Sequence, residues 1–455
     1  MSKCPFYPKP YANKASTMLT FLLKRRSWLD GLYEKSYKMQ SGYVKMPNFN
    51  LYVVNDTREV KRIMIDEVKI FPKSEFLHKL LSPLLGESIF TTNGEVWRRQ
   101  RELLRPSFEM TRISKVFNLM SEAVKDLMQR FDKYEDKSII EVDEMMTFVT
   151  ADVIFRTIMS AKLDEEKGKE ILDAFVIFQE QSVHSAMRRM FHFPRWLSHI
   201  LGDSKRLKAG EIIRKNLKEI IRPRYESVNL NEPPKNEDIL ESLLRVVDAN
   251  TNERFSFEEI LDQVAMLFLA GHETTASSLT WTLYCLSMFE NEQEKAYEEV
   301  MRATGGKNVE ITHLPQMHHL TNVFKEALRL YPPVGFFARE AKVDTKIRDK
   351  EIAKGSGVVV APWLIHRHEM FWKDPHEFKP SRFDEEYKKD AYLPFGKGER
   401  VCIGYGFAMQ EAILILSNIL KVYKLELQDG FTPDVVGRLT VRSANGMNIK
   451  FTKRR

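Results

Sequence analysis

Apolar residues recur at helical spacing over most of the chain between residues 94 and 330, so we expect helices to dominate this stretch. The longest helix is predicted over residues 256–289, where Ser256 and Glu259 have the spacing of a capping box. At about 1.5 Å per residue, this helix would be roughly 50 Å long. Because its middle is apolar nearly all round, we expect it to be buried and to cross the molecule.

Few stretches of the sequence predict β-strands, and those stretches are short. Residues 43–46 and 51–54 are rich in β-branched and aromatic side chains and flank a turn, which predicts a hairpin. Residues 334–339 and 357–360 also read as extended, and residues 431–451 as a last hairpin that dips towards a central site. The pattern therefore predicts a fold that is mainly α with a small β region.

Two further segments lie near the N-terminus. Residues 27–39 predict a helix. Residues 71–90 are apolar but interrupted by Pro72, Pro83 and Gly86, so they predict an irregular segment packed on the core.

The composition fits one large globular unit. The chain has 455 residues, 43% of them hydrophobic, which is enough to bury a sizeable core. No linker, repeat or low-complexity tract divides it, so we expect a single domain over residues 1–455 without a fused reductase.

Charge and cysteine content exclude several classes of protein. The net charge of +7 is dispersed, which argues against nucleic acid as a partner. Three cysteines are too few for a disulfide framework, so we expect an intracellular, cytoplasmic protein. The apolar run at residues 18–23 is too short to span a bilayer, and we therefore expect a soluble protein without a membrane anchor.

The strongest chemical motif is Phe395-x-x-Gly398-x-Arg400-x-Cys402-x-Gly404. It places a cysteine on a glycine-bearing loop directly before an apolar helix, where backbone N–H groups and the helix dipole favour a thiolate. The thiolate would be ready to bind a metal. A free cysteine alone is more often a small buried hydrophobe, so Cys402 is notable only because of the surrounding pattern.

A second motif, Ala270-Gly271-His272-Glu273-Thr274, lies in the middle of the predicted central helix. A carboxylate in an apolar interior is costly unless it has a partner or a function. Small residues one turn earlier would let a flat cofactor approach. Alternatively, Glu273 points to a wet face and Thr274 bonds back to its own helix, while His272, which has no second ligand at helical spacing, is structural or solvent-facing.

Two pairs of side chains at helical spacing complete the set of motifs. Glu326 and Arg329 share a helix face and can form an ion pair. Trp97 and Arg101 also share a face, from which an indole N–H and a guanidinium could bind an anion. Each pair alone would be ordinary surface chemistry.

In this order along residues 97–404, the motifs resemble those of the cytochrome P-450 superfamily of haem-thiolate monooxygenases, in its bacterial soluble type. The resemblance implies the cytochrome P-450 fold, with one haem b (iron protoporphyrin IX) between the long helix and the cysteine loop. Cys402 would be the axial iron ligand, whose thiolate favours O–O cleavage. The other cofactor-binding residues would be Phe395, which shields the sulfur, the propionate partners Arg400, Trp97, Arg101 and Arg339, and Gly404 and Ala270.

The resemblance also assigns roles away from the iron ligand. Thr274 would hold water or oxygen, and Glu273 would relay protons. Glu326, Arg329 and Arg382 would form a buried lock near the haem, although Ser381 stands where the family often has an acid.

The implied reaction inserts one oxygen atom of O2 into an apolar small molecule, with fatty acid-like chains as the first expectation. Electrons would come from a separate ferredoxin or flavodoxin that docks on a basic face formed by Lys397, Arg400, Arg98, Arg99 and Arg105. The expected substrate pocket contains Phe71, Phe76, Leu77, Leu80, Leu81, Phe268, Val334, Phe336 and Phe337.

Two other classes stay open. A peroxygenase of related fold would use hydrogen peroxide and usually lacks the acid–threonine pair, and a non-enzymatic haem sensor would need no proton relay.

Overall fold

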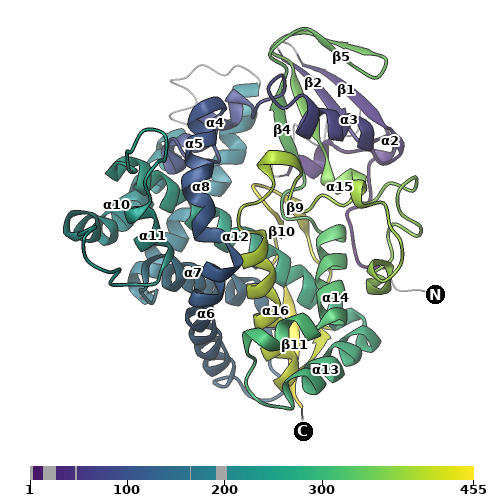
Figure 1. Cartoon of the computed structure of the whole chain (residues 1–455). Coiled ribbons are helices and arrows are strands. Elements are labelled where there is room, and N and C mark those ends of the chain that lie inside the picture. Colours follow the sequence, from purple (N-terminus) through teal and green to yellow (C-terminus); the bar gives the residue numbers. More distant parts are fainter. Residues whose placement is uncertain (1–3, 14–26, 47–48, 164, 191–201, 455) are drawn as a thin grey trace.

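A long helix, α12 (Phe257–Met288), runs through the middle of the molecule (Figure 1). It contains 32 residues and is therefore about 48 Å long. The predicted capping box is confirmed, because the Ser256 hydroxyl accepts a hydrogen bond from the Glu259 backbone N–H and the Glu259 carboxylate accepts one from the Ser256 backbone N–H at 2.8 Å. The helix is buried along most of its length, as predicted.

In this computed structural model, the described residues are 4–13, 27–46, 49–163, 165–190 and 202–454. The predicted N-terminal apolar run at residues 18–23 lies outside them, as does the turn at residues 47–48 between the two hairpin strands. Among the described helices, none has the length and apolar character needed to cross a bilayer.

Helices make up most of the fold, in agreement with the predicted fold class. The longer ones besides α12 are α4 (Glu75–Leu85), α5 (Gly94–Leu104), α6 (Met110–Phe131), α7 (Val142–Met159), α8 (Glu165–Met190), α10 (Ser204–Ser227), α11 (Ile239–Arg245), α13 (Glu290–Thr304), α14 (His318–Leu330) and α16 (Tyr405–Val422). Short helices are α2 (Glu34–Lys38), α3 (Thr57–Lys61) and α15 (Pro362–Ile365).

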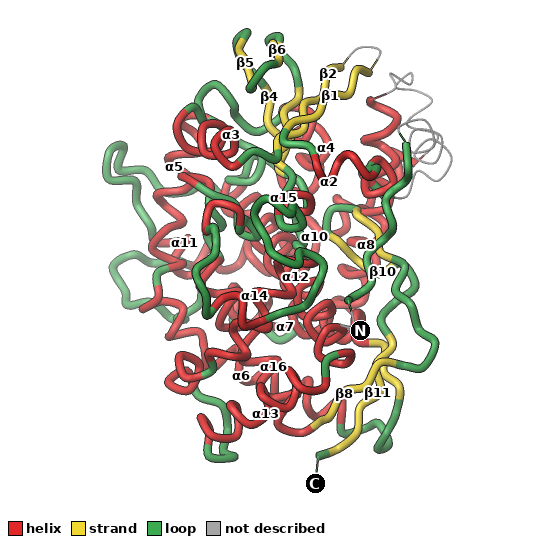
Figure 2. The backbone as a smooth tube through the Cα atoms, turned by 90° about the vertical axis from the view of Figure 1, so that its right-hand side faces the viewer, coloured by secondary structure: helices red, strands yellow, loops and turns green. Residues whose placement is uncertain are grey.

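Four small sheets flank the helices. Figure 2 shows the four-stranded sheet and the β5-β6 hairpin at one end of the molecule and strands β8 and β11 at the other. The four-stranded sheet has the order β1 (Ser41–Met46), β2 (Phe49–Val54), β7 (Gly357–Val360), β4 (Phe337–Glu340), with β2 and β7 parallel. The others are β3 (Ile139–Glu141), β11 (Asn448–Lys453) and β8 (Tyr423–Leu427); β9 (Val435–Gly437) with β10 (Val441–Ser443); and β5 (Thr345–Ile347) with β6 (Lys350–Ile352).

Two sequence predictions differ from the structure. Residues 71–90 contain a regular helix, α4, because Pro83 lies in its last turn, where it removes one hydrogen bond only two residues before the helix ends. The single helix predicted over residues 27–39 is divided into a 3-10 turn, Trp28–Gly31, and α2, because Leu32 and Tyr33 adopt extended backbone between them.

The close packing of α12 on α7 depends on Gly271. A Cβ at Gly271 would lie 2.4 Å from Cδ1 of Ile154, so a larger residue would require the Ile154 side chain to move. The Thr150 hydroxyl donates to the His272 carbonyl at 3.0 Å and ties the two helices together at the same level. The helix that carries the acid–threonine motif is thus fixed by direct helix–helix contact.

The hydrophobic core forms two clusters. The large one joins the helices around α12, and a smaller one lies beneath the four-stranded sheet, with Val54, Phe71, Val358 and Trp372 fully or almost fully buried. Between the two clusters lies the site described next.

Candidate active site

A largely apolar cavity of about 300 Å³ lies between the middle of α12 and the loop that precedes α16. Its wall contains Ala270, Thr274 and Thr275 from α12 and Cys402 from the loop. The sequence motifs that are farthest apart in the chain therefore meet at one place.

The Cys402 loop has a tightly determined shape. Gly398 has a φ of +75°, and a Cβ there would come within 2.3 Å of the Met64 carbonyl oxygen, so this position requires glycine. The Cys402 backbone N–H donates to the Phe395 carbonyl at 2.9 Å, and the Phe395 ring packs edge-on against Tyr405 with 4.7 Å between ring centroids. The thiol is thus held by backbone contacts on one side and by an aromatic pair on the other.

Cys402 is accessible only on the side where it lines the cavity, since protein atoms surround it otherwise. Burial raises the pKa of the thiol, and it outweighs the Gly404 backbone N–H and the Arg101 charge, which lower it. The backbone N–H groups and the helix dipole, which were expected to favour the thiolate, are therefore insufficient alone to ionise Cys402. A bound cation would supply the missing stabilisation of the charged sulfur.

Four cations gather along the cavity wall: Lys73, Arg101, Arg339 and Arg400. Burial, followed by the charges of the other three, lowers the pKa of Lys73 well below its usual value. Burial and the Arg400 charge lower the pKa of Arg339 to about 10. The Nε atoms of Arg339 and Arg400 are buried without a hydrogen-bond partner. Such a cluster requires an anion, because buried charges are stable only when neutralised.

Trp97 forms part of the same wall and is almost fully buried. The Arg400 guanidinium lies over its indole, with 4.7 Å between the guanidinium carbon and the ring centroid. Arg101 lines the cavity one helical turn further along and donates to the Val401 carbonyl at 2.8 Å. Three of the four cations, Arg101, Arg339 and Arg400, were predicted from the sequence. Lys73 belongs to no motif and has no spacing that would predict its place in the cavity wall.

The site fits a haem group on the evidence of these side chains. The cations would neutralise two propionates, and the open space beside Gly404, where a Cβ would touch nothing within 4 Å, would admit a flat ring. Ala270 presents a small side chain to the same cavity. Cys402 would be the iron ligand.

Thr274 lines the cavity, and its hydroxyl donates to the Ala270 carbonyl at 2.7 Å. The back-bonding alternative for Thr274 is therefore what the structure contains. Because the hydroxyl proton is used inside the helix, the oxygen is left as an acceptor towards the cavity.

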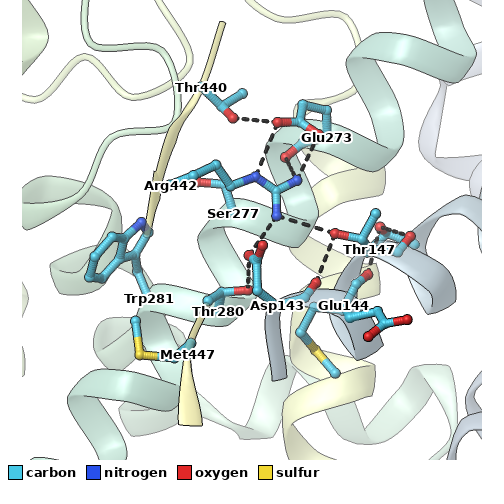
Figure 3. Close-up of polar contacts among 12 residues, drawn as sticks. Asp143, Glu144, Thr147, Glu273, Ser277, Thr280, Trp281, Thr440, Arg442 and Met447 are labelled. Atoms are coloured by element: carbon cyan, nitrogen blue, oxygen red, sulfur yellow. Dashed lines mark hydrogen bonds and ion pairs between the residues drawn. The ribbon is translucent and has the colours of Figure 1, made fainter. Parts of the chain in front are cut away.

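Glu273 points away from the cavity, towards β10 (Figure 3). Its carboxylate accepts hydrogen bonds from Arg442 Nη2 at 2.6 Å, from Arg442 Nε at 3.1 Å and from the Thr440 hydroxyl at 2.5 Å. Burial raises the pKa of Glu273, but the Arg442 charge and hydrogen bonds outweigh it and lower the pKa to about 2. The structure thus does not bring the proposed proton relay acid to the cavity.

Arg442 connects β10 to α7 as well as to α12. Its Nη1 donates to Asp143 Oδ1 at 2.6 Å and to the Thr147 hydroxyl at 3.2 Å, both on α7 (Figure 3). No local pattern predicts a role for this residue, because its partners lie roughly 170 and 300 residues away along the chain.

The predicted lock is formed and fully buried. Arg329 donates to both oxygens of Glu326 at 2.8 Å, and Arg382 Nε donates to Glu326 Oε1 at 3.1 Å. The lock continues to the cysteine loop through His366, whose Nδ1 donates to the Arg329 carbonyl and whose Nε2 accepts from the Leu393 N–H at 2.8 Å. Burial lowers the pKa of His366 well below its usual value, so the ring is neutral and can accept this bond.

The predicted substrate residues divide into two groups. Val334, Phe336 and Phe337 line the cavity, as does Leu77. The others, Phe71, Phe76, Leu80, Leu81 and Phe268, do not line it. Phe268 instead packs edge-on against Phe155 and beside His272. His272 is fully buried and its Nδ1 donates to the Phe268 carbonyl at 2.6 Å, which confirms the structural interpretation.

Similar proteins support the same conclusion. Residues 25–447 match the family model described as Cytochrome P450. A cytokinin hydroxylase of Arabidopsis thaliana is 30% identical over 402 residues, covering 87% of this chain and 77% of that protein. Cytochrome P450 4V2 of Homo sapiens is 29% identical, covering 86% of this chain and 78% of that protein, and Cytochrome P450 714B3 of Zea mays is 29% identical, covering 84% and 71%. With its cysteine loop, its cation cluster and this match over most of its length, the chain belongs to the cytochrome P450 family and is a haem-thiolate monooxygenase that binds haem b.

Proposed function

We propose that the protein hydroxylates apolar, fatty acid-like molecules with electrons from a separate ferredoxin or flavodoxin. The observation that carries the substrate class is the composition of the cavity wall. Apart from the cation cluster, Cys402 and the hydroxyls of Thr274, Thr275 and Ser278, aliphatic, aromatic and small residues form nearly all of it. Such a wall favours hydrocarbon over polar substrates.

Each residue at the site has a defined task in this reaction. Cys402 would ligate the iron, and haem, when bound, supplies the activation of O2. The Thr274 oxygen accepts a hydrogen bond from water in the cavity and so fixes the water's position. The apolar wall, including Val334 and Phe336, excludes other water and orients the substrate.

The substrate proposal is tested by titrating the purified protein with fatty acids, terpenoids and steroids while the haem Soret band is recorded. We expect fatty acids to shift the band towards the high-spin form, because an apolar chain displaces water from the cavity. Steroids or terpenoids that shift the band, with no shift by any fatty acid, would contradict the substrate class.

A pair of variants sharpens this test. Val334→Phe narrows the cavity, so it should weaken fatty acid binding roughly tenfold or more. Phe268→Leu alters a buried side chain on α12 outside the cavity wall and should leave the binding constant within about twofold. Equal effects of the two changes would show that the substrate binds elsewhere.

Four of the five cations expected at the docking face are paired with a carboxylate: Arg98 with Glu95, Lys397 with Asp390, Arg400 with Glu399 at 3.7 Å, and Arg99 with two acids. Arg99 pairs with Glu259 at 2.6 Å and with Asp248 at 3.2 Å. Arg400 has a side chain only 9% exposed. These two residues are therefore poor contacts for a partner protein.

Arg105 is better suited to dock a partner. It is exposed, and its charge acts on Arg101, which donates to the Val401 carbonyl next to Cys402. Val401 and Tyr405 are exposed apolar side chains on the same loop and helix start. Basic and apolar groups thus lie together on the cysteine side, a combination suited to a small acidic carrier protein.

The docking proposal is tested by Arg105→Glu. We expect the rate of haem reduction by an acidic ferredoxin or flavodoxin to fall roughly tenfold at low salt, and the difference to shrink at high salt. Lys35→Glu, an equal reversal at an exposed position on α2, should change the rate little. Equal rates for Arg105→Glu and the unchanged protein at low salt would contradict the proposed face.

A peroxide-dependent reaction is the second candidate, because the ionised Glu273 is held by Arg442 and does not reach the cavity. Product formation with hydrogen peroxide but none with O2 and reduced carrier would establish it. The single-domain organisation, the bacterial soluble type and the cytoplasmic location remain predictions.

A further inference from the structure

Glu411 is a buried acid that none of the roles above uses. It lies on α16 and is 1% exposed, and among the described residues no group makes a hydrogen bond of ordinary geometry to its carboxyl oxygens, although the Thr275 hydroxyl faces them. Buried polar atoms are nearly always paired, with protein or with ordered water. A carboxyl group with two unpaired oxygens therefore indicates a place for water or a group that exchanges a proton.

The protonated form of this carboxyl group is favoured, because an unpaired carboxylate in an apolar interior is costly. Burial raises the pKa of Glu411 well above its usual value, and the hydroxyl of Thr275, the side chain that faces it, lowers the pKa by less. Glu273 is its opposite, since that acid is ionised and fixed by Arg442.

The position of Glu411 connects it to the cavity. Thr275 lines the cavity and follows Thr274 directly in the chain. Phe407 and Ala408 also line it, and Glu411 lies four and three residues beyond them, on the same face of α16. Glu411 is thus separated from the cavity by the Thr275 side chain.

We propose that Glu411 delivers protons through the Thr275 hydroxyl to a water molecule in the cavity. In one transfer, the Glu411 O–H bond breaks and its proton moves to the Thr275 oxygen, while the Thr275 hydroxyl proton moves to water in the cavity. Glu411 is left as a carboxylate and regains a proton from bulk water before the next transfer. When one atom of O2 leaves as water it takes up two protons, and the two electrons come from the carrier protein.

Glu411 acts through Thr275, so it is a positioning and proton-supplying residue. The inference rests on the proposed use of O2 and external electrons, but it holds for any apolar substrate. The first test needs neither substrate nor carrier, and its failure is therefore distinct from failure of the proposed function.

The first test is infrared difference spectroscopy on photolysis of carbon monoxide from the reduced, haem-loaded protein. Light-driven release perturbs groups around the cavity. We expect a carbonyl stretch of a protonated carboxyl group that shifts in D2O and is absent in Glu411→Gln. If the unchanged protein shows no such band, or if Glu411→Gln retains it, the proposal is overturned.

The second test measures product formed per O2 consumed. Glu411→Gln keeps the shape and removes the acidic proton, so we expect this ratio to fall roughly tenfold or more, with the missing oxygen released as hydrogen peroxide. Product formation driven by added hydrogen peroxide should be unchanged, because peroxide already carries the protons. Thr275→Val should behave like Glu411→Gln, and Glu411→Asp should recover part of the ratio.

Ser417→Ala is the matched control. Ser417 is a fully buried polar residue on the same helix whose hydroxyl donates to the Leu414 carbonyl, and it does not line the cavity. Its replacement should leave product per O2 unchanged. If Glu411→Gln lowers the peroxide-driven and the O2-driven reactions equally, the residue is merely structural and the proposal is overturned.

Discussion

At the scale of single residues, the two acids near the cavity differ through their partners. Glu273 has a guanidinium in contact with both oxygens, so its buried charge is stable. Glu411 faces the hydroxyl of Thr275 and gains no compensating charge, so burial raises its pKa and favours the protonated form. Both sit in helices with apolar surroundings, and sequence context alone ranked Glu273 as the functional acid. Only the position of Arg442, far along the chain, distinguishes them.

Replacement of Glu273 should destabilise the fold. We expect Glu273→Gln to lower the free energy of unfolding at pH 7 by about 3 kcal/mol, because it leaves Arg442 buried with a weaker partner. Glu258→Gln on the same helix, at an exposed position, should cost less than about 1 kcal/mol. Urea unfolding of both variants measures the difference.

The pH dependence of folding stability is a second test of the Glu273–Arg442 ion pair. The pKa of Glu273 is about 2 in the folded protein and 4.5 at its usual value, so the carboxylate stabilises the fold above pH 4.5. This contribution is lost as the pH falls from about 4.5 towards 2. Glu273→Gln should therefore reduce the loss of stability over that range, and equal slopes in both proteins would contradict the ion pair.

At the scale of elements, α12 is held by close contact with α7 at Gly271. Its missing Cβ leaves room for the Ile154 side chain. Gly271 also lines the cavity beside Ala270, so the expectation that these small residues make room for a cofactor stays a prediction.

A double-mutant cycle tests this contact. Gly271→Ala should destabilise the protein by about 1–3 kcal/mol, because the new methyl group would overlap Ile154 Cδ1. Ile154→Val removes that atom and alone should cost about 0.5–1.5 kcal/mol. The double variant should be more stable than the sum of the two costs predicts, by about 1 kcal/mol. Additive costs in chemical denaturation would show that Gly271 is not limited by Ile154.

The sequence predicted well those features that depend on neighbours along the chain. The capping box at Ser256, the Glu326–Arg329 pair and the turn of the Cys402 loop are all set by spacings of three to ten residues. It failed where a feature depends on distant partners. Arg442 is fixed by α7 and α12, and Lys73 joins arginines from three other segments at the cavity, so no local pattern marks either.

Helix α4 shows another limit of prediction from sequence. Pro83 suggested an irregular segment, but a proline in the last turn removes one hydrogen bond only two residues before the helix ends. The directions of the side chains on α12 could not be predicted either. Phe268 was expected in the pocket but packs against Phe155, because a helix that is apolar nearly all round does not mark which face borders the cavity.

At the scale of the whole molecule, one cavity is lined by side chains from segments that begin at Met64 and end at Ala408. The lock around Glu326 holds the cysteine loop through His366, and the Arg442 cluster holds the opposite wall. The protein thus builds two rigid walls and places a cluster of cations between them, an arrangement that is complete only with a bound anionic cofactor.

The central claim is that Cys402 ligates haem iron as a thiolate. The most direct test is the absorption spectrum of the reduced, carbon monoxide-bound protein, with and without Cys402→Ser. We predict a red-shifted Soret band for the unchanged protein and its loss in Cys402→Ser, with bound haem verified by extraction. A Cys402→Ser protein that retains the red-shifted band, or an unchanged haem-loaded protein that never shows it, would contradict the account.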